Sequence, residues 1–463
     1  MRIESDSLGK VSIPSGAYYG PVTQRAVENF PISGVQFHHG FIRAYAMIKR
    51  SAAVANVRLG GLDPKISKAI VKACDEIIAG KLADQFPVDV FQAGTGTSTN
   101  MNLNEVVANR ALEIMHKRRG DYKTINPNDH VNMCQSTNDT FQCAINIAAH
   151  IAIEERLVPA LAEYERAMAR KAREFSRIVK TGRTHLMDAV PVTLGQEFSG
   201  YSVEREMRLI RAASDELLKL HIGGTAVGTG LNSYPKYPPL FLKELKNVSG
   251  HSFKKARNNF EMTQNLPAIA ETSSALRQLS IKLIKTMNDL RLMSSGPHTG
   301  IGEIILPAVQ PGSSIMPGKV NPSMPEALTM VCFRAIGNDS TILMCAQGGQ
   351  FELNIFGPIA AHCLLESIET LSNSLVVVTK RCITGIKPNR KRLEYYFEHN
   401  SEIATALSPL LGYSKTAKLV KEAERNGMSI RELVIREKLL SKKELDEALS
   451  QSRLTKPDLP IER

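Results

Sequence analysis

Apolar residues recur at three- and four-residue spacing over long stretches of the chain from about residue 138 onward. This spacing places apolar side chains on one face of an α-helix. The stretches are long for helices of a globular protein, and the longest would span roughly 40 Å or more. Five such helices predict a bundle that buries its apolar faces lengthwise. The stretches are 141–178, 193–220, 262–293, 324–345 and 355–380.

The pattern on either side of these stretches predicts shorter elements. We expect short strands near residues 1–11, helices at 38–57, 64–79, 389–397 and 414–426, and a helical pair within 429–450. The chain then divides into three domains: a mixed, mostly helical domain over 1–137, the long-helix bundle over 138–387, and a small helical domain over 388–463. The flanks of the long helices also carry apolar residues, which predicts that copies of the chain pack helix against helix into an oligomer.

The chain of 463 residues is basic, with a formal net charge of +12. Lys and Arg are spread along the sequence and mixed with Asp and Glu, apart from one cluster at 387–392. No nucleic-acid-binding motif accompanies them, so we expect no nucleic-acid partner. A solvated surface explains most of the excess, and attraction of a small dianion is a further consequence.

Cysteine content and hydropathy predict a cytoplasmic protein. The seven cysteines include no CxxC pair, and an odd number in apolar helical surroundings indicates reduced, buried thiols. No leader-like apolar segment occurs at the N-terminus, and no 18-residue apolar span occurs anywhere, so no membrane association is expected. The cysteines are Cys74, Cys134, Cys143, Cys332, Cys345, Cys363 and Cys382.

Four short segments rich in Gly, Ser, Thr and Asn lie among the helical stretches. They are GTGTSTNMN at 94–102, NPND at 126–129 continuing to QSTND at 135–139, GRTH at 182–185 followed by Asp188, and GSSIMPGKVNP at 312–322. Each alone can be explained as helix capping and turn chemistry. Together they supply neutral donors, one Lys and one His, without a Cys/His cluster that would bind a metal. This combination suits a small substrate with two carboxylates.

The segment 312–322 has the most specific chemistry. Its Gly and Pro residues predict a loop with defined bends. Ser313 lies between Gly312 and Ser314, so successive backbone N–H groups can form an anion-binding nest, and Lys319 can neutralise a carboxylate. A serine in that environment can act as a base. A phosphate-binding loop is the alternative, but the pattern GxxxxGK[ST] fails because Val320 follows Lys319.

These motifs resemble those of the fumarase/aspartase superfamily, and the resemblance covers essentially the whole chain. GSSIMPGKVNP looks like the family signature. The other matching strings are GTSTNMNLNEV at 96–106, NPNDHVN at 126–132, QSTND at 135–139, GRTHLMDAVPVTLGQE at 182–197 and GGTAVGTGLN at 223–232. The resemblance implies an all-α, three-domain fold and a homotetramer around a twenty-helix core, with five helices from each subunit. It also implies active sites assembled from three subunits, and no cofactor.

The resemblance also assigns roles to individual residues. Ser313 would be the base, on a mobile loop, and His185 matches the family histidine, which Glu326 would orient. The carboxylates and amino group would be bound by Thr97, Ser136, Thr137, Asn138, Thr184, Ser314, Lys319 and Asn321. A second anion site at residues 126–129 stays open, as does the effect of His298, which stands where the family commonly has Arg.

The motifs divide between two activities. The resemblance to aspartate ammonia-lyases lies in the strings QSTND, GTSTNMN, DQFPVDVFQ (84–92), LPAVQPGSS (306–314) and the C-terminal LSKKELDEAL and TKPDLP. The resemblance to fumarases lies in His185 and in the strings PEALTMV (325–331) and FELNIF (351–356). We therefore expect an aspartate ammonia-lyase, which converts L-aspartate to fumarate and ammonium. A class II fumarase, which converts L-malate to fumarate and water, is the alternative. A non-catalytic structural member of the superfamily is a third possibility.

Overall fold

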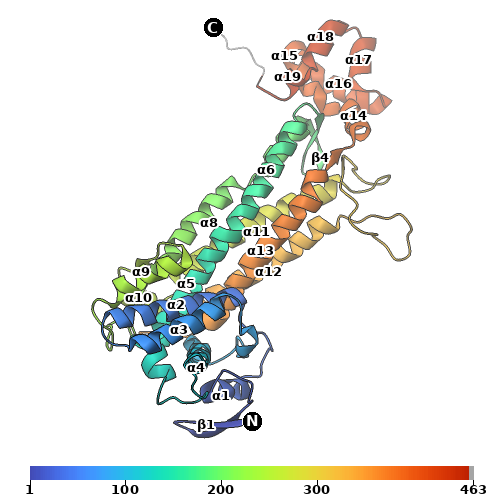
Figure 1. The fold of residues 1–463 in the computed structure, drawn as a ribbon. Helices are drawn as coiled ribbons and strands as arrows, with labels where there is room; N and C mark the ends of the chain where they lie inside the picture. Colours follow the sequence, from blue (N-terminus) through green and yellow to red (C-terminus); the bar gives the residue numbers. More distant parts are fainter. Residues whose placement is uncertain (458–463) are drawn as a thin grey trace. The chain divides into compact units, whose positions relative to one another are not determined.

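The computed structural model describes residues 1–457, and its elements are mostly helices (Figure 1). Residues 458–460, the end of the TKPDLP string, lie outside the described residues. The chain forms two compact units. The first contains Met1–Pro159, Glu206–Ile281 and Val331–Ser372, and the second contains Ala160–Arg205, Lys282–Met330 and Asn373–Arg463. The predicted helical fold is confirmed. The predicted three-domain division stays a prediction, although α5 begins at Thr137 and α14 at Arg390, next to its two boundaries.

The first unit begins with a two-stranded antiparallel sheet and continues through helices packed around α2. Its elements are β1 (Arg2–Asp6), β2 (Gly9–Ile13), α1 (Pro21–Asn29), α2 (His39–Arg58), α3 (Pro64–Ile78), η1 (Ala83–Gln85), η2 (Gly94–Gly96), α4 (Thr97–Ile114), η3 (Pro127–Val131), α5 (Thr137–Ala152), η4 (Ile153–Leu157), β5 (Lys219–Leu220), α9 (Tyr237–Ser249), β6 (Lys254–Lys255) and α10 (Asn259–Gln264). Helices α2 and α3 lie side by side (Figure 1). The strands predicted near residues 1–11 and the helices predicted at 38–57 and 64–79 are confirmed.

The second unit contains a β-hairpin and the C-terminal helices. Its elements are β3 (Val179–Thr184), β4 (Met187–Thr193), α7 (Leu194–Ser199), β7 (Ile304–Ile305), η5 (Ile383–Gly385), β8 (Lys387–Pro388), α14 (Arg390–His399), η6 (Ser401–Leu407), α15 (Ser408–Leu411), α16 (Tyr413–Asn426), α17 (Ile430–Arg436), α18 (Lys442–Ala448) and α19 (Gln451–Leu454). The C-terminal helices bury a core that includes Ile403, Leu407, Leu419, Leu433 and Leu445. The C-terminal helices predicted from the sequence are confirmed.

Five helices contain residues of both units: α6 (Val158–Glu174), α8 (Glu204–Leu217), α11 (Pro267–Met293), α12 (Ser323–Gln347) and α13 (Gly357–Arg381). The helices predicted at 324–345 and 355–380 are confirmed as α12 and α13. The stretch 141–178 is confirmed as α5, η4 and α6 in succession, with a π-helical turn at Ile153–Leu157.

Two of the predicted long helices are interrupted. The single helix predicted over 193–220 is wrong, because α7 ends at Ser199 and α8 begins at Glu204. Tertiary contacts satisfy the backbone in the gap: Lys282 Nζ donates to the Gly200 carbonyl oxygen at 2.6 Å, and the Val203 N–H donates to Glu165 at 2.7 Å. The stretch 262–293 breaks before Pro267, where α11 begins, because proline disfavours helical geometry in the residue before it.

The core of the first unit is an aromatic cluster that joins α2 to α5. The Phe141 ring lies 5.0 Å from that of Phe41 and 6.0 Å from that of Tyr45, measured between centroids. All three side chains are buried. Because Phe141 lies one helical turn after Thr137, this packing fixes the N-terminal end of α5 against α2.

Candidate active site

Two helix N-termini meet in the first unit, and the predicted substrate-binding residues of that unit lie there. Thr97 is the first residue of α4 and is exposed, whereas Thr137 is the first residue of α5 and is buried. The Asn100 side chain of α4 donates a hydrogen bond to Thr137 Oγ1 at 3.0 Å, which joins the two helix ends. A helix N-terminus presents unpaired N–H groups and a partial positive charge. Two of them together form a suitable site for an anion.

In the part of the chain that the structure describes, the N-terminus of α4 is capped at its third residue only, where the Thr99 N–H donates to Gln92 Oε1 at 2.9 Å. Gly96, its N-cap residue, has φ +91° and offers no side chain as a cap. Thr95 also has a positive φ of 66°, which is rare and costly for a β-branched residue. Its N–H donates to the carbonyl oxygen of Ile355 at 2.8 Å, which helps to hold this conformation. The strain is located beside the exposed N-terminus of α4, where an anion would bind.

The N-terminus of α5 is held by a capping box and by the loop at 223–232. Ser136 Oγ accepts from the Asn138 N–H at 3.2 Å, and the Asp139 carboxylate accepts from the Ser136 N–H at 2.9 Å. The Asn138 side chain donates to the carbonyl oxygen of Ala226 at 2.7 Å. Three of the predicted binding residues, Ser136, Thr137 and Asn138, are therefore consecutive at one capped helix end.

Asp139 connects that loop to the helix. Its carboxylate accepts from the N–H groups of Gly223 at 2.9 Å and Thr225 at 3.1 Å in addition to Ser136. Burial raises the pKa of Asp139 to about 6, although these three donors and the charge of Lys49 oppose the shift. Asp139 belongs to the QSTND string, but no sequence pattern indicated this connecting role.

His221 supports the N-terminal end of α5 through a hydrogen bond to its first turn. Its Nε2 lies 3.2 Å from the carbonyl oxygen of Asn138, and because a carbonyl only accepts, Nε2 carries the proton. Burial lowers the pKa of His221 to about 4, so the ring is neutral at physiological pH. We infer a structural role in holding the first turn of α5 for this histidine.

In the second unit, residues 312–321 form a closed, exposed loop. The Gly312 N–H donates to the carbonyl oxygen of Lys319 at 2.8 Å, and the Asn321 side chain donates to the carbonyl oxygen of Gly312 at 2.6 Å. A Cβ on Gly312 would lie 2.6 Å from the Lys319 carbonyl oxygen, so the closure requires glycine there. The Ser314 and Lys319 side chains are exposed.

Ser313 lies at the start of this loop and its hydroxyl oxygen receives two backbone donors. The N–H groups of Ile315 and Met316 point at Oγ, at 3.2 and 2.9 Å. The nest predicted from the sequence involved the N–H groups around Gly312, Ser313 and Ser314, whereas these two donors come from the following residues and are aimed at the serine oxygen itself. Two such donors stabilise negative charge on that oxygen, which favours the serine as a base.

His185 and Thr184 lie at the tip of the hairpin β3–β4, an element that the sequence did not predict. Thr184 pairs with Met187, so His185 and Leu186 form a two-residue turn, with φ of 56° and 62°. Turns with two positive φ values favour Asn and Gly, so His and Leu here are strained. The tip is exposed, with Leu186 73% and Met187 70% accessible.

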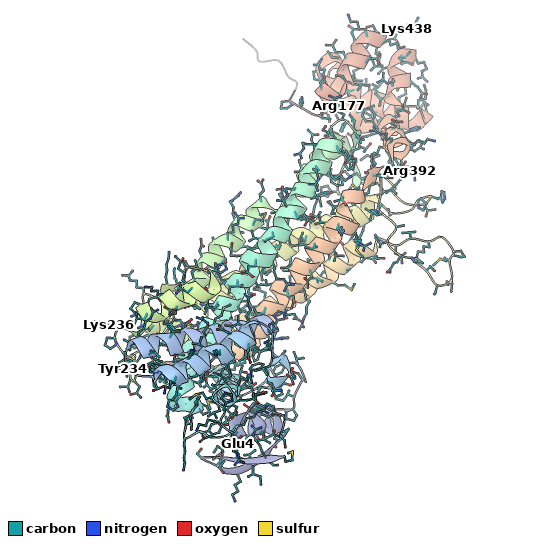
Figure 2. The ribbon with its side chains drawn as sticks, in the orientation of Figure 1. Glu4, Arg177, Tyr234, Lys236, Arg392 and Lys438 are labelled. Carbon is teal, nitrogen blue, oxygen red and sulfur yellow. The ribbon has the colours of Figure 1, made fainter. Side chains whose placement is uncertain are left out.

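A buried ion-pair network holds strand β3 of this hairpin. Glu303 is fully buried, and its carboxylate lies 2.7 Å from Lys180 Nζ and 2.7 Å from Arg183 Nη1. Beside this network, Arg392 on α14, labelled in Figure 2, donates to the carbonyl oxygens of Gly300 at 3.0 Å and Ile301 at 3.2 Å. These contacts fix the strands while the tip with His185 stays accessible.

Glu326, predicted to orient His185, lies in the first turn of α12. Its carboxylate is 3.8 Å from Arg291 Nη2, and within the described chain no hydrogen bond joins it to His185. Among residues 1–457, no group of three or more His, Cys, Asp or Glu side chains is arranged to hold a metal ion. No helix in the same range is long and apolar enough to cross a membrane.

Comparison with known proteins identifies the family. A family profile described as Lyase matches residues 9–337, and one described as Fumarase C C-terminus matches residues 403–456. The chain belongs to the fumarase/aspartase superfamily. Two groups of superfamily relatives match it at similar identity. An aspartate ammonia-lyase from a Bacillus species is 46% identical over 99% of this chain and 98% of its own. A class II fumarate hydratase from Bacillus subtilis is 42% identical over 98% of this chain and 99% of its own.

A solved superfamily structure matches the fold closely. A fumarate lyase:delta crystallin from Brucella melitensis, crystallised with cobalt, has a TM-score of 0.95 and 44% identity. The match covers 98% of this chain and 100% of that one. The similarity therefore extends over both compact units.

The sequence analysis assigned no role to Lys49 or Asn100, which the structure connects to Thr137 through hydrogen bonds. Asn100 was quoted within GTSTNMN without a role. Lys49 lies in the predicted helix at 38–57, on the same helical face as Tyr45 and Ala53, four residues before and after it. A lysine on an apolar helical face was the available signal. The seven cysteines are free and buried, which confirms the expectation of reduced, packed thiols.

Proposed function

We propose that the protein is an aspartate ammonia-lyase that converts L-aspartate to fumarate and ammonium. The observation that carries the proposal is the Ser313 hydroxyl, whose oxygen receives two backbone N–H donors on an exposed loop shared with Lys319. A serine hydroxyl must lose its own proton at low cost to remove a weakly acidic C–H proton, and donors aimed at its oxygen lower that cost. The N-terminus of α4, where Gly96 offers no side-chain cap, and the first turn of α5 would supply neutral donors for carboxylates.

The proposed reaction is an anti-elimination. Ser313 Oγ takes the Cβ proton of aspartate, and the electron pair passes to the adjacent carboxylate, which becomes a doubly charged aci-carboxylate. The pair then forms the C=C bond as the C–N bond of the protonated amino group breaks, and ammonia leaves with the electrons of that bond. Release of the proton held by Ser313 restores the base, and uptake of a proton by ammonia gives ammonium. The carboxylates and the amino group would be bound by Thr97, Ser136, Thr137, Asn138, Thr184, Ser314, Lys319 and Asn321. Donors preset around the aci-carboxylate lower the barrier for the first step.

His185 has a different role in the two candidate reactions. In the aspartate reaction it would contact a substrate carboxylate, because the leaving ammonia needs no acid. In the fumarase alternative it would be linked to protonation of the leaving hydroxyl through a water. His185 and the match to a fumarate hydratase at similar identity both support the fumarase alternative. The strings QSTND and GTSTNMN favour the aspartate reaction.

We further propose that the active protein is a homotetramer with shared active sites. Several large apolar side chains on the long helices are exposed in the single chain, and such surfaces on helices mark association sites. They include Met330, Phe333, Leu343 and Met344 on α12 and Val376 and Val377 on α13. The exposed hairpin tip with His185 is a second surface that another copy would cover. Glu326 would then approach His185 of another copy.

A side-by-side assay tests the proposed function. The purified chain is given L-aspartate or L-malate, and fumarate is followed by its ultraviolet absorbance. Turnover of aspartate without malate supports the proposal, and turnover of malate alone supports the fumarase alternative. Turnover of neither substrate, with fumarate also unbound in calorimetry, would favour a non-catalytic member of the superfamily and overturn the proposal.

A further inference from the structure

Lys49 on α2 is a fully buried lysine whose ammonium group contacts three side-chain amides. Its Nζ donates to Asn100 Oδ1 at 2.7 Å, to Asn132 Oδ1 at 2.9 Å and to Gln135 Oε1 at 3.0 Å. An ammonium has three protons, so each has an acceptor. Among the described residues, no carboxylate lies within ion-pair distance of Nζ. A positive charge is thus held in the interior by neutral groups alone, and its desolvation is offset only by these hydrogen bonds.

This ammonium fixes the orientation of the amides around it. A lysine ammonium only donates hydrogen bonds, so the amide atom that faces it must be oxygen. The Asn100 nitrogen must then face the other way, toward Thr137 Oγ1, at 3.0 Å. Because Thr137 Oγ1 accepts this bond, its own proton is free to be donated elsewhere. The chain of contacts runs from Lys49 through Asn100 to the hydroxyl at the start of α5.

We propose that Lys49 is a positioning residue for the dianion site. The positive charge of Lys49 polarises the Asn100 amide and, through it, the Thr137 hydroxyl. This inference rests on the proposed function, in which Thr137 donates to a substrate carboxylate. Polarisation by the ammonium strengthens the Asn100 N–H as a donor, and that in turn makes the Thr137 O–H a better donor. The same contacts keep the N-termini of α4 and α5 together.

The charges around Lys49 leave this site positive. Asp139 on α5 and Cys74 on α3 are the titratable groups that act on it, and the Tyr45 ring lies 5.2 Å from Nζ. Asp139 is satisfied by its own three backbone donors, and burial keeps the Cys74 thiol neutral by raising its pKa. Burial lowers the pKa of Lys49 to about 7, and the charge of Asp139 opposes that shift. A bound dianion favours the protonated form, so binding and protonation of Lys49 support each other.

The test measures binding of succinate, a saturated four-carbon dicarboxylate, to the full-length protein by titration calorimetry. Lys49→Met should weaken binding roughly 10- to 100-fold, because a charge-assisted contact is lost. Lys49→Arg, which keeps the positive charge, should recover part of the succinate affinity that Lys49→Met loses. The matched control is Lys171→Met. Lys171 is also buried, and its Nζ donates to the Ile386 carbonyl oxygen and Glu174, so its loss should lower stability without weakening succinate binding.

The outcomes separate this inference from the proposed function. A wild-type protein that binds neither succinate nor fumarate overturns the proposed dicarboxylate chemistry. If the wild type binds succinate and Lys49→Met binds it equally well, only the role of Lys49 is overturned. Equal weakening by Lys171→Met would make the effect a general loss of stability and would also overturn it.

A second measurement decides the matter if Lys49→Met does not fold. Succinate is almost entirely doubly ionised between about pH 7 and pH 9, because both of its carboxyl groups titrate below that range, so its own charge is constant there. Binding should take up protons near pH 8, measured in buffers of different ionisation enthalpy, and affinity should fall as pH rises through this range. The measurement is made on His185→Gln, so that this histidine contributes nothing. Affinity independent of pH, with no proton uptake, would contradict the inference.

Discussion

The chemistry at the residue scale depends on where single atoms find their hydrogen-bond partners. Ser313 Oγ receives two N–H groups from its own loop, and Thr137 Oγ1 receives one from Asn100. The first arrangement stabilises an oxyanion, whereas the second leaves a hydroxyl proton free to be donated. The base and the binding group are therefore distinguished by the direction of their hydrogen bonds.

Replacement of Ser313 by alanine tests the base. Ser313→Ala should lower kcat roughly 10²- to 10⁴-fold, the usual contribution of general-base catalysis, and leave succinate affinity within a few-fold. Steady-state assays and calorimetry measure both. Ser7→Ala, in the exposed turn between β1 and β2, serves as the control and should retain full turnover. Wild-type activity in Ser313→Ala would remove this residue as the base.

Glycine is required at position 96 both by the backbone angle and by the neighbouring Phe141 ring. With φ at +91°, a side chain is strained, and a Cβ would overlap the Phe141 ring. Gly96→Ala should therefore lower the unfolding free energy by about 2 kcal/mol or more, visible as a reduced Tm. Gly250→Ala is a matched control, because its φ is +78° in open space, and it should cost only about 1 kcal/mol. Equal losses of unfolding free energy in the two variants would contradict the expected clash with Phe141.

At the scale of elements, the predicted site residues lie on helix ends, a hairpin tip and one closed loop. Helix α4 begins at the exposed Thr97 and α5 at the buried Thr137. The hairpin β3–β4 presents a strained two-residue turn, and residues 312–321 are closed by backbone contacts. In each case a rigid element carries a short polar segment, which is the usual arrangement of functional groups on a scaffold.

The loop closure is tested at Gly312. In Gly312→Ala, the new Cβ would lie 2.6 Å from the Lys319 carbonyl oxygen and 2.7 Å from the Asn321 nitrogen. The loop must open, so kcat should fall about 10-fold or more, while Tm changes little because the loop is exposed. Gly16→Ala, with nothing within 4 Å and an ordinary φ, is the control. Unchanged kcat would show that closure does not position Ser313.

At the scale of the whole molecule, the exposed apolar side chains on the long helices are the main unexplained feature of the single chain. Phe333 and Met330 on α12 are 59% and 63% accessible. In water such side chains favour association, because burial of apolar surface is the main favourable contribution in most protein–protein contacts. The proposed tetramer accounts for them.

A charge in this surface tests the assembly. Phe333→Glu should reduce the mass measured by light scattering from four chains to fewer, since burial of an unpaired carboxylate is unfavourable. Turnover should fall with it, because the proposed sites are shared. Leu8→Glu, 79% accessible in the β1–β2 turn, is the control and should remain a tetramer. A fully active monomer of Phe333→Glu would contradict the shared sites.

The sequence by itself determined the helical class, the positions of α2, α3, α12 and α13 to within two residues at each end, and the four polar segments. Periodicity records which face of a helix is apolar, and the motif strings are read directly from the chain. The prediction over 193–220 failed because periodicity does not register that Lys282 and Glu165 satisfy the backbone between α7 and α8. The hairpin β3–β4 was missed because its turn carries His185 and Leu186 instead of Asn and Gly.

Only the tertiary structure decided which side chains meet. Lys49 lies 51 positions before Asn100 and 86 before Gln135, and no local pattern connects residues at such separations. The burial of Lys49, the three donors to Asp139 and the two donors to Ser313 depend on how the backbone folds in space. Local periodicity fixes the elements because it reflects neighbours along the chain, whereas charge, proton position and hydrogen-bond direction in a site depend on neighbours across it.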